Sequence, residues 1–437
     1  MSREMKESAL PWVGNIPSNW RLGRIKHIYS VTLGKMISPL QTESEQTLEN
    51  YLCAANIKWS GVDTSVHKQM WFNKSEKEQY LLEDGDVLIM EGGTVGTTTI
   101  YHNEFSPCYI QNSVHKCRGK DMIANKFLYY WMQVVQSSGY IDTVCNKATI
   151  QHYTKDKVKE TPCILVPEDE QHAIVRYLDS KCASIDKAIE RHRKIIEKLE
   201  EYRTEVVTSE ILGLHHNDVI ETGIDWMSRM SASRKAWRLK YLVKEPLKYG
   251  ANESGTTYDE TLPRYIRITD ITPEGRLKDT GKLSLTEEQA SKYLLEDGTI
   301  LFARSGATVG KTFLYREAYG RSAFAGYLIS AVPDTEMMVP GWLKYYTESL
   351  PYKNWKDMIF TQATIQNIGA DKYSELIVPV CSIDEQIAVV SKLDEISTRI
   401  KRMIETQSCI IKKLEKYRKS IIYNAVTGKI DCREAVK

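Results

Sequence analysis

The six residues Tyr80-Leu-Leu-Glu-Asp-Gly85 occur a second time, letter for letter, as Tyr293-Leu-Leu-Glu-Asp-Gly298. The two copies lie 213 residues apart. Other short matches follow in the same order at offsets of 214 or 215 residues: Thr94-Val-Gly96 with Thr308-Val-Gly310, Ala148-Thr-Ile-Gln151 with Ala363-Thr-Ile-Gln366, and Asp169-Glu-Gln171 with Asp384-Glu-Gln386. This regularity indicates two copies of one unit, and a unit of this length excludes a solenoid, whose repeats run to about 20–50 residues.

Tryptophans extend the match toward the start of each copy. Trp12 pairs with Trp226, and Trp20-Arg-Leu pairs with Trp237-Arg-Leu. In the repeated hexapeptide, Glu-Asp-Gly is a turn signal, and the apolar run after it is typical of a strand. We therefore expect a structural hairpin corner with Tyr and Leu in the core, and not a pair of catalytic carboxylates.

Composition narrows the class of protein. The 437 residues are 42% hydrophobic and 27% charged, enough for two or three soluble domains, and no apolar run is long enough to span a membrane. The first residues, MSREMKESALPW, lack the apolar core of a secretory signal. Nine cysteines without a CxxC pair favour reduced thiols in the cytoplasm and argue against a zinc site. A net charge of +2 leaves DNA binding open and argues against non-specific coating of DNA.

Each copy has two parts of different texture. The first part mixes short β-rich runs with helical patterns and predicts an α+β globule. The expected strands include Asp86-Val-Leu-Ile-Met90, Tyr265-Ile-Arg-Ile268 and Thr299-Ile-Leu-Phe-Ala303, and the expected helices include 125–132 and 341–346.

The second part of each copy, about 168–207 and 384–424, contains no Gly or Pro and predicts one long helix. Its seam positions are spaced alternately four and three residues apart, which is the pattern of a coiled coil. The two seams are Leu178, Cys182, Ile185, Ile189, His192, Ile196, Leu199 and Leu393, Ser397, Ile400, Ile404, Gln407, Ile411, Leu414. Polar His192 and Gln407 share one seam position, which is expected to set the register rather than bind a ligand.

The predicted architecture is therefore two globular domains joined by two long antiparallel coiled-coil helices, with a pseudo-two-fold internal repeat. The predicted division is residues 1–165 for the first globule, 166–210 for the first long helix, 211–380 for the second globule, and 381–437 for the second long helix and the tail. The helices are expected to act as a stiff rod between the globules.

Two enzyme motifs come close to matching. Ser305-Gly-Ala-Thr-Val-Gly310-Lys311-Thr312 resembles a phosphate-binding P-loop, but only three residues separate its glycines where that motif has four. Ser106-Pro-Cys-Tyr109 resembles the base-holding motif of DNA methyltransferases, with Cys in place of the second Pro. A nucleotide-binding enzyme that uses Gly306–Thr312 stays an alternative, as does a coiled-coil scaffold that binds proteins.

Several segments resemble the specificity subunits of type I restriction–modification systems. They are Trp12-Val-Gly-Asn-Ile-Pro-Ser-Asn-Trp20, Glu83-Asp-Gly-Asp-Val-Leu88, Arg304-Ser-Gly-Ala-Thr-Val-Gly-Lys311, Ala363-Thr-Ile-Gln366 followed by Pro379 and Asp384-Glu-Gln386, Lys413-Leu-Glu-Lys-Tyr-Arg418 and Val426-Thr-Gly428. The resemblance covers nearly the whole chain, and the order of the motifs and their duplication are more specific than any one motif.

This resemblance implies a non-catalytic subunit. Each globule would be a target recognition domain that reads one half of a bipartite, asymmetric site in double-stranded DNA. The helices would set the spacer and dock two modification subunits, which methylate adenine with S-adenosylmethionine. Restriction subunits that use ATP and Mg²⁺ would join them, so that no cofactor is expected in this chain.

Candidate DNA contacts follow from the shared loops, because phosphates are held by Lys, Arg, Ser and Thr, and bases are read by Arg, Lys, Asn and Gln. They are Arg304, Ser305, Lys311, Thr312, Thr97, Gln151, Gln366 and Lys147. The first copy has Glu91 where the second has Arg304, and Thr97 where the second has Lys311. A phosphate-binding role of these positions therefore cannot be common to both copies.

Overall fold

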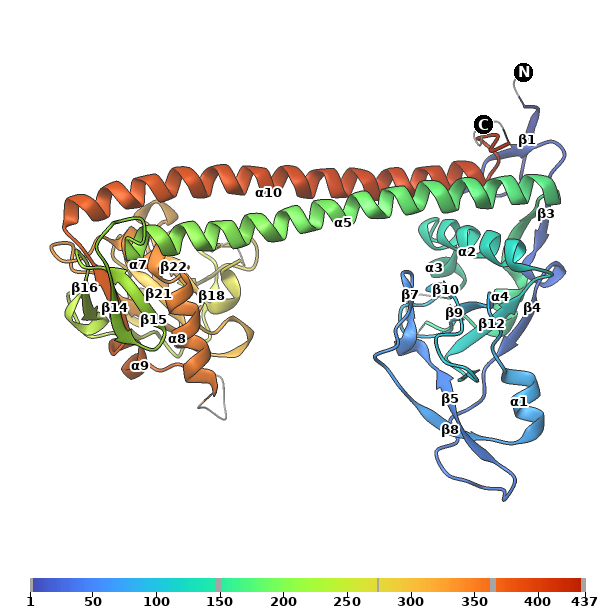
Figure 1. Cartoon of the computed structure of the whole chain (residues 1–437), viewed down its shortest axis with the longest axis horizontal. Helices are drawn as coiled ribbons and strands as arrows, with labels where there is room; N and C mark the ends of the chain where they lie inside the picture. Colours follow the sequence, from blue (N-terminus) through green and yellow to red (C-terminus); the bar gives the residue numbers. More distant parts are fainter. Residues whose placement is uncertain (1–2, 146–150, 273–274, 362–366, 434–437) are drawn as a thin grey trace. The chain divides into compact units, whose positions relative to one another are not determined.

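The computed structural model describes residues 3–145, 151–272, 275–361 and 367–433 (Figure 1). The chain divides into unit 1, Met1–His192 with Cys409–Lys437, and unit 2, Arg193–Ser408. Both units mix helices and short strands, as the predicted α+β class requires. The division cuts through both long helices, α5 (Glu168–Leu212) and α10 (Ile383–Val426), and so differs from a division at the helix ends.

The elements of unit 1 precede α5 in the chain. Its strands are β1 (Met5–Glu7), β2 (Asn15–Pro17), β3 (Arg21–Arg24), β4 (Ser30–Leu33), β5 (Thr47–Leu52), β6 (Ile57–Lys58), β7 (Gly61–Val62), β8 (Gln69–Phe72), β9 (Val87–Met90), β10 (Thr98–Ile100), β11 (Tyr109–Ile110), β12 (Val114–Arg118) and β13 (Pro162–Leu165). Its helices are α1 (Lys74–Tyr80), α2 (Met122–Ser137), α3 (Tyr140–Val144) and α4 (Lys155–Glu160), with 3-10 turns η1 (Ile25–His27) and η2 (Ala54–Asn56).

The elements of unit 2 lie between α5 and α10. Its strands are β14 (Val219–Ile224), β15 (Met227–Ser231), β16 (Lys235–Arg238), β17 (Lys248–Tyr249), β18 (Thr256–Thr257), β19 (Arg264–Ile266), β20 (Leu283–Ser284), β21 (Ile300–Ala303), β22 (Thr312–Leu314), β23 (Ser322–Phe324), β24 (Leu328–Ala331) and β25 (Ile377–Val380). Its helices are α6 (Glu287–Ala290), α7 (Pro340–Tyr346), α8 (Leu350–Thr361) and α9 (Ala370–Ser374), with 3-10 turns η3 (Leu239–Tyr241), η4 (Ile268–Asp270), η5 (Gly306–Thr308) and η6 (Glu317–Tyr319).

The same four-stranded sheet lies at the centre of each unit. Its order is β10-β9-β12-β4 in unit 1 and β22-β21-β24-β17 in unit 2, and every neighbouring pair is antiparallel. A second sheet contains one parallel pair in each unit, β11 with β5 and β23 with β19. The internal repeat inferred from sequence is therefore a repeat of topology.

The repeated hexapeptide is a turn, but it is not the corner of the hairpin. It leads into β9 in unit 1 and β21 in unit 2, and Gly85 N donates to Tyr101 O (2.8 Å) as Gly298 N donates to Tyr315 O (3.1 Å). The turn thus closes the open end of the β9–β10 and β21–β22 hairpins. Gly85 and Gly298 have φ of +90° and +86°, a left-handed conformation that favours glycine.

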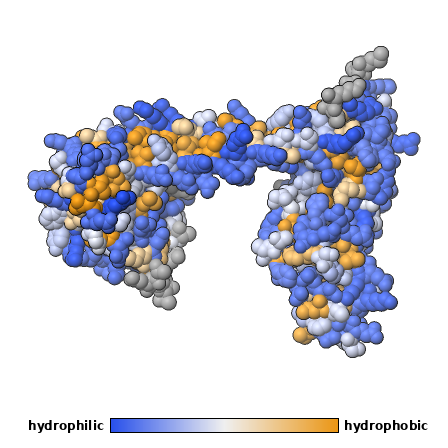
Figure 2. All heavy atoms as spheres, viewed as in Figure 1, coloured by the Kyte–Doolittle hydropathy of each residue, from blue (hydrophilic) through white to orange (hydrophobic). Residues whose placement is uncertain are grey.

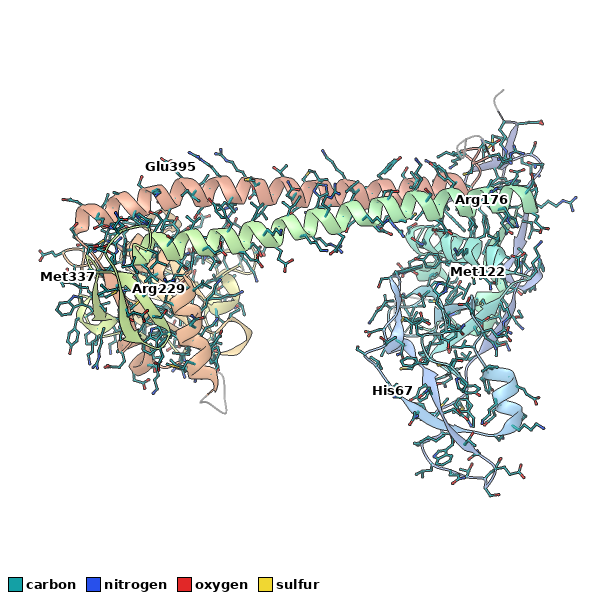
Figure 3. All side chains as sticks on the ribbon, viewed as in Figure 1. His67, Met122, Arg176, Arg229, Met337 and Glu395 are labelled. Carbon is teal, nitrogen blue, oxygen red and sulfur yellow. The ribbon has the colours of Figure 1, made fainter. Side chains whose placement is uncertain are left out.

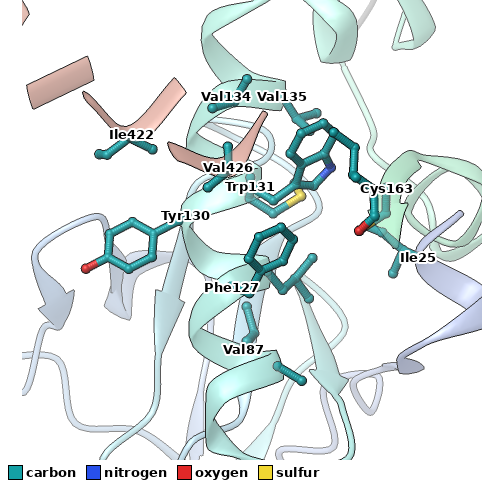
Figure 4. Close-up of a cluster of buried hydrophobic side chains, with 14 of the residues drawn as sticks. Ile25, Val87, Phe127, Tyr130, Trp131, Val134, Val135, Cys163, Ile422 and Val426 are labelled. Atoms are coloured by element: carbon teal, nitrogen blue, oxygen red, sulfur yellow. The ribbon is translucent and has the colours of Figure 1, made fainter. Parts of the chain in front are cut away.

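A helix covers the central sheet in each unit. Figure 4 shows α2 of unit 1 with Phe127 and Trp131 near Val87 of β9, and with Ile422 and Val426 of α10 close by. Tyr130 Oη donates to Asp179 (2.7 Å), and in unit 2 Tyr345 Oη donates to Asp394 (2.6 Å). These hydrogen bonds fix the covering helix to the start of the long helix in the same way in both units.

The long helices pair antiparallel within each unit. In unit 1, Leu178 and Cys182 share a core with Ile422 and Val426, and farther along α5, Ile185 and Ile189 pack with Ile411, Leu414 and Ile421. In unit 2, Val207 and Ile211 share a core with Val389 and Leu393. The seam residues Leu178, Ile185, Ile189, Leu393 and Ile400 are buried, and His192, Ile196, Leu199, Ile404, Gln407, Ile411 and Leu414 are half-buried.

Each long helix stops at a left-handed glycine. Gly213 follows α5 with φ +66°, and Gly428 lies just past α10 with φ +72°. A Cβ on Gly213 would meet Ser231 at 2.9 Å, and one on Gly428 would meet Pro17 at 2.4 Å. Ser231 and Pro17 occupy matching places in the hairpins β14–β15 and β1–β2, since they pair with Val219 and Met5. The end of α10 therefore packs in unit 1 as the end of α5 packs in unit 2.

One sequence pairing was wrong. Strand β3 pairs with β13 in the same register in which β16 pairs with β25, which places Gly23 opposite Cys163 and Trp237 opposite Val378. Trp20 therefore corresponds to Arg234, and Trp237 is 40% exposed. Trp20 Nε1 donates to Glu170 (3.0 Å), and Arg234 forms an ion pair with Glu385, the matching position of α10. The Trp-Arg-Leu match is coincidental because different side chains fill the same structural place.

Candidate nucleic-acid interface

The loop after strand β21 of unit 2 carries four of the eight predicted contacts. It begins at Arg304 and ends where β22 begins at Thr312. Its backbone N–H groups are used internally: Val309 N donates to Gly306 O, Gly310 N to Ala303 O and Lys311 N to Thr308 O. Since a strand and not a helix follows, and since these N–H groups are occupied, the loop lacks the geometry of a P-loop. The structure of this loop therefore does not support the hypothesis of a nucleotide-binding enzyme.

Arg304 is held by an aromatic ring at this strand end. Its guanidinium carbon lies 4.8 Å from the ring centroid of Tyr249, the last residue of β17. Its Nη1 donates to Gly326 O at the long distance of 3.4 Å, and its Nε is buried without a hydrogen-bond partner. The guanidinium of Arg304 can therefore donate hydrogen bonds to acceptors from outside the unit.

The other predicted contact residues of unit 2 differ in exposure and in hydrogen bonding. Lys311 is exposed, and no ion pair or side-chain hydrogen bond involves it within the described residues. Ser305 is half-buried and pairs with Asn367 in an isolated β-bridge. Thr312 shares a hydrogen bond with Thr347 (Oγ1 to Oγ1, 2.7 Å). Lys311 is therefore available to a partner, and Thr312 is committed to the fold. Gln366 lies outside the described residues.

Unit 1 presents different chemistry at the same place. Glu91 corresponds to Arg304, because Glu91 O accepts from Tyr153 N (2.8 Å) as Arg304 O accepts from Ile368 N (2.9 Å). Burial raises the pKa of the Glu91 carboxyl, and His152 opposes that shift. A carboxylate here repels phosphate and can only accept hydrogen bonds when ionised.

Thr97 is not an available contact. It is 5% exposed, and its hydroxyl donates to Thr94 O (2.8 Å), so it stabilises the turn instead. Gln151 is half-buried, and its amide lies 3.5 Å from Asp142 Oδ1. Lys147 lies outside the described residues. The structure therefore favours Arg304 and Lys311 over the other predicted contacts.

Sequence reasoning missed residues that surround this strand end. In unit 2, Tyr249 holds Arg304, and Tyr327, whose carbonyl accepts from Arg304 N, is 61% exposed. In unit 1, the segment after β4 exposes Met36, Ile37 and Leu40. All are positions at which the two copies differ, and that divergence was the available signal. The differing positions of the two copies could be matched to one another only from the strand registers.

The long helices also expose apolar side chains. Tyr202, Ile387, Met403 and Tyr417 are all about half exposed, and Figure 2 shows hydrophobic residues along both helices. These side chains are spread over both helices, and large exposed apolar side chains can contribute to a protein-binding surface. Among the described residues, no group of three or more His, Cys, Asp or Glu could hold a metal ion, and no helix is long and apolar enough to cross a membrane.

Comparison with known proteins agrees with this geometry. Residues 17–201 match the family model of the type I restriction modification DNA specificity domain. A Haemophilus influenzae protein named as the type I restriction enzyme specificity subunit S.HindORF215P is 28% identical over 117 residues, which are 27% of this chain and 29% of that protein. The match thus spans less than a third of that relative.

Solved structures align with nearly the whole chain. One, described as the structural basis of complex assembly and conformational transition of the type I R-M system, covers 95% of this chain and 99% of its own, with a TM-score of 0.64 and 15% identity. The HsdS subunit from Thermoanaerobacter tengcongensis covers 95% and 98%, with a TM-score of 0.46. Residues 17–201 are thus similar to the specificity domain of type I restriction–modification systems, and the whole chain shares the fold of the type I R-M structure with a TM-score of 0.64.

Proposed function

We propose that the chain is the non-catalytic subunit that gives a type I restriction–modification complex its DNA sequence specificity. The observation that carries this proposal is the pair of units with one topology and opposite charge at the same strand end, Arg304 in one and Glu91 in the other. Two readers of one fold but different chemistry suit a bipartite, asymmetric site. Joining them raises the effective concentration of the second contact once the first has formed.

The same proposal assigns partners to the helices. The exposed apolar side chains of α5 and α10 would dock two modification subunits, which bind S-adenosylmethionine and methylate adenine. Restriction subunits that use ATP and Mg²⁺ would join this assembly. A cytoplasmic location follows from action on cellular DNA.

Methylation mapping tests the proposal. The chain is co-expressed with the modification subunits of its own system in a host without adenine methylation, and methylated adenines are mapped across the host genome. We expect one split, asymmetric motif with an unread spacer, and no methylation when either component is expressed alone. Methylation without this chain, or an unsplit motif, would contradict the proposal.

The helices allow a sharper test of the spacer. One heptad is inserted into each helix where the units meet, between His192 and Arg193 and between Ser408 and Cys409. Seven residues lengthen a helix by about 10 Å and keep the seam pattern, and about 10 Å corresponds to about three base pairs. The spacer should grow by about that number with both half-sites unchanged. A changed half-site would show that the helices take part in base reading.

A further inference from the structure

Most arginines near the sheets of this protein are committed to the fold. Arg234, buried in unit 2, forms an ion pair with Glu385 and donates to the carbonyls of Ile211 and Glu210. Arg118 in unit 1 donates to both carboxylate oxygens of Asp86 at 2.6 and 2.7 Å. These two arginines use their donors on carboxylates and carbonyls, and Arg264 of β19, whose Nε is also buried without a partner, donates from Nη2 to Lys278 O (2.6 Å).

Arg304 differs from Arg234 and Arg118. Within the described residues no carboxylate pairs with it, its Nε has no partner, and its one side-chain hydrogen bond is the 3.4 Å contact to Gly326 O. A guanidinium has five donors, so most of those of Arg304 are uncommitted. Leaving buried donors unsatisfied costs stability, which is expected where the partner is a ligand.

The guanidinium is nevertheless held in place. The Tyr249 ring supports it at 4.8 Å, and Tyr249 is itself fixed at both ends. Its backbone pairs with Ile329 of β24, and its hydroxyl accepts from Ala370 N (2.9 Å). Stacking on an aromatic ring keeps the planar fork in one orientation and lowers the entropy that it loses on binding.

The surroundings suit nucleic acid. Lys311, at the far end of the same loop, is exposed and forms no ion pair in the described part of the chain. Lys311 and Arg304 are suited to two different contacts. An exposed, flexible ammonium group can hold a phosphate, whereas an oriented guanidinium fork can recognise a base edge.

We propose that Arg304 reads a guanine in the half-site bound by unit 2, and that Tyr249 is its positioning residue. Arginine bonds O6 and N7 of guanine with two donors in the major groove, a pattern that no other base presents. Glu91 cannot make this contact, so the contact is confined to the half-site bound by unit 2. This inference rests on the proposed function of the chain.

The test uses the methylation map of the complete complex. Arg304→Gln should relax the motif at one guanine, with the preference for guanine over other bases falling about 10- to 100-fold. The other half-site and the spacer should stay unchanged. Arg304→Lys, which keeps the charge and loses the fork, should also relax that position, and it serves where the Gln variant folds poorly.

The Tyr249 variants separate positioning from general stability. Tyr249→Phe keeps the ring and should keep the guanine preference. Tyr249→Ala removes the support and should relax the same base position as Arg304→Gln. A purely structural tyrosine would lower methylation at all sites without changing the motif.

Charge-matched controls complete the design. Arg229→Gln changes an exposed arginine on the separate β14–β15 hairpin, labelled in Figure 3, and should leave the motif intact. Uniformly weaker methylation by Arg304→Gln with the motif unchanged would overturn the inference and make Arg304 a phosphate or packing residue. Absence of a split motif with the wild-type chain would instead overturn the proposed function, which distinguishes the two failures.

Discussion

Unit 1 and unit 2 share a sheet order, a turn and a set of backbone hydrogen bonds, yet they place Glu91 and Arg304 at the same point. The shared bonds come from main-chain atoms, so they do not constrain the side chain. The strand end can therefore change charge without changing the fold. In this chain the residues that are alike in the two copies keep the architecture, and the residues that differ are the better candidates for reading DNA.

The two units should differ most in the unfolding free energy that each loses when the residue just before β3 or β16 is replaced by alanine. Trp20 is fully buried, and Trp20→Ala should lower the unfolding free energy of unit 1 by about 3–5 kcal/mol, because it leaves a cavity and removes a donor from Glu170. Arg234→Ala should cost unit 2 about 1.5–3 kcal/mol through lost charged hydrogen bonds. Denaturant-dependent hydrogen exchange resolved by peptide measures each unit separately. Equal losses would contradict the predicted difference in stability between the two side chains.

Acid should destabilise unit 1 more than unit 2 through one buried histidine. The pKa of His115 is lowered from 6.5 to about 4, mainly by burial; the hydrogen bond to Tyr153 O opposes this shift, and the charge of Lys155 adds to it. The unfolded chain binds this proton near pH 6.5 and the folded unit only near pH 4. Its contribution to stability is therefore present above pH 6.5 and falls by about 3 kcal/mol toward pH 4.

Ile329 occupies the corresponding position in unit 2, so that unit lacks this titration. His115→Gln keeps a donor for Tyr153 O and should flatten the pH dependence of unit 1 between pH 6.5 and 4. The measurement is hydrogen-exchange stability of both units across this range. An unchanged slope in the variant would assign the acid sensitivity to other groups.

The repeated glycines should differ by a smaller amount. A Cβ on Gly85 would meet the flexible end of Met122 at 2.5 Å, whereas one on Gly298 would meet the ring of Pro340 at 2.7 Å. Both substitutions should cost about 1–2 kcal/mol for the left-handed backbone. Gly298→Ala should cost about 1 kcal/mol more than Gly85→Ala, since a proline ring cannot move aside as a methionine does. Thermal unfolding of matched variants measures the difference.

The smallest effect concerns phosphate contact. Lys311→Gln should weaken binding of a DNA duplex by the complex evenly across sequences and lower the slope of log K against log salt by about 0.9, the value of one phosphate. Thr97→Ser, at the matching buried position of unit 1, should leave the slope unchanged. A changed base preference in the Lys311 variant would show that this lysine reads sequence.

The sequence alone determined the features that depend on local pattern. The seven-residue spacing predicted two long helices, the apolar runs predicted β9, β19 and β21, and the repeated segments predicted a duplicated fold. These predictions are possible because hydrophobic periodicity and turn residues determine structure over short stretches of the chain. The hexapeptide is a structural turn as predicted, but the prediction that it forms the corner of a hairpin was wrong, because it lies at the open end.

Only the tertiary structure decided which residues correspond and which are available to DNA. Strand registers replaced the Trp20–Trp237 pairing with Trp20–Arg234, and burial removed Thr97 from the candidate contacts. The support of Arg304 by Tyr249 joins residues 55 positions apart that meet only because β17 and β21 both pair with β24. Such neighbours are set by long-range strand pairing, and a linear pattern carries no record of it.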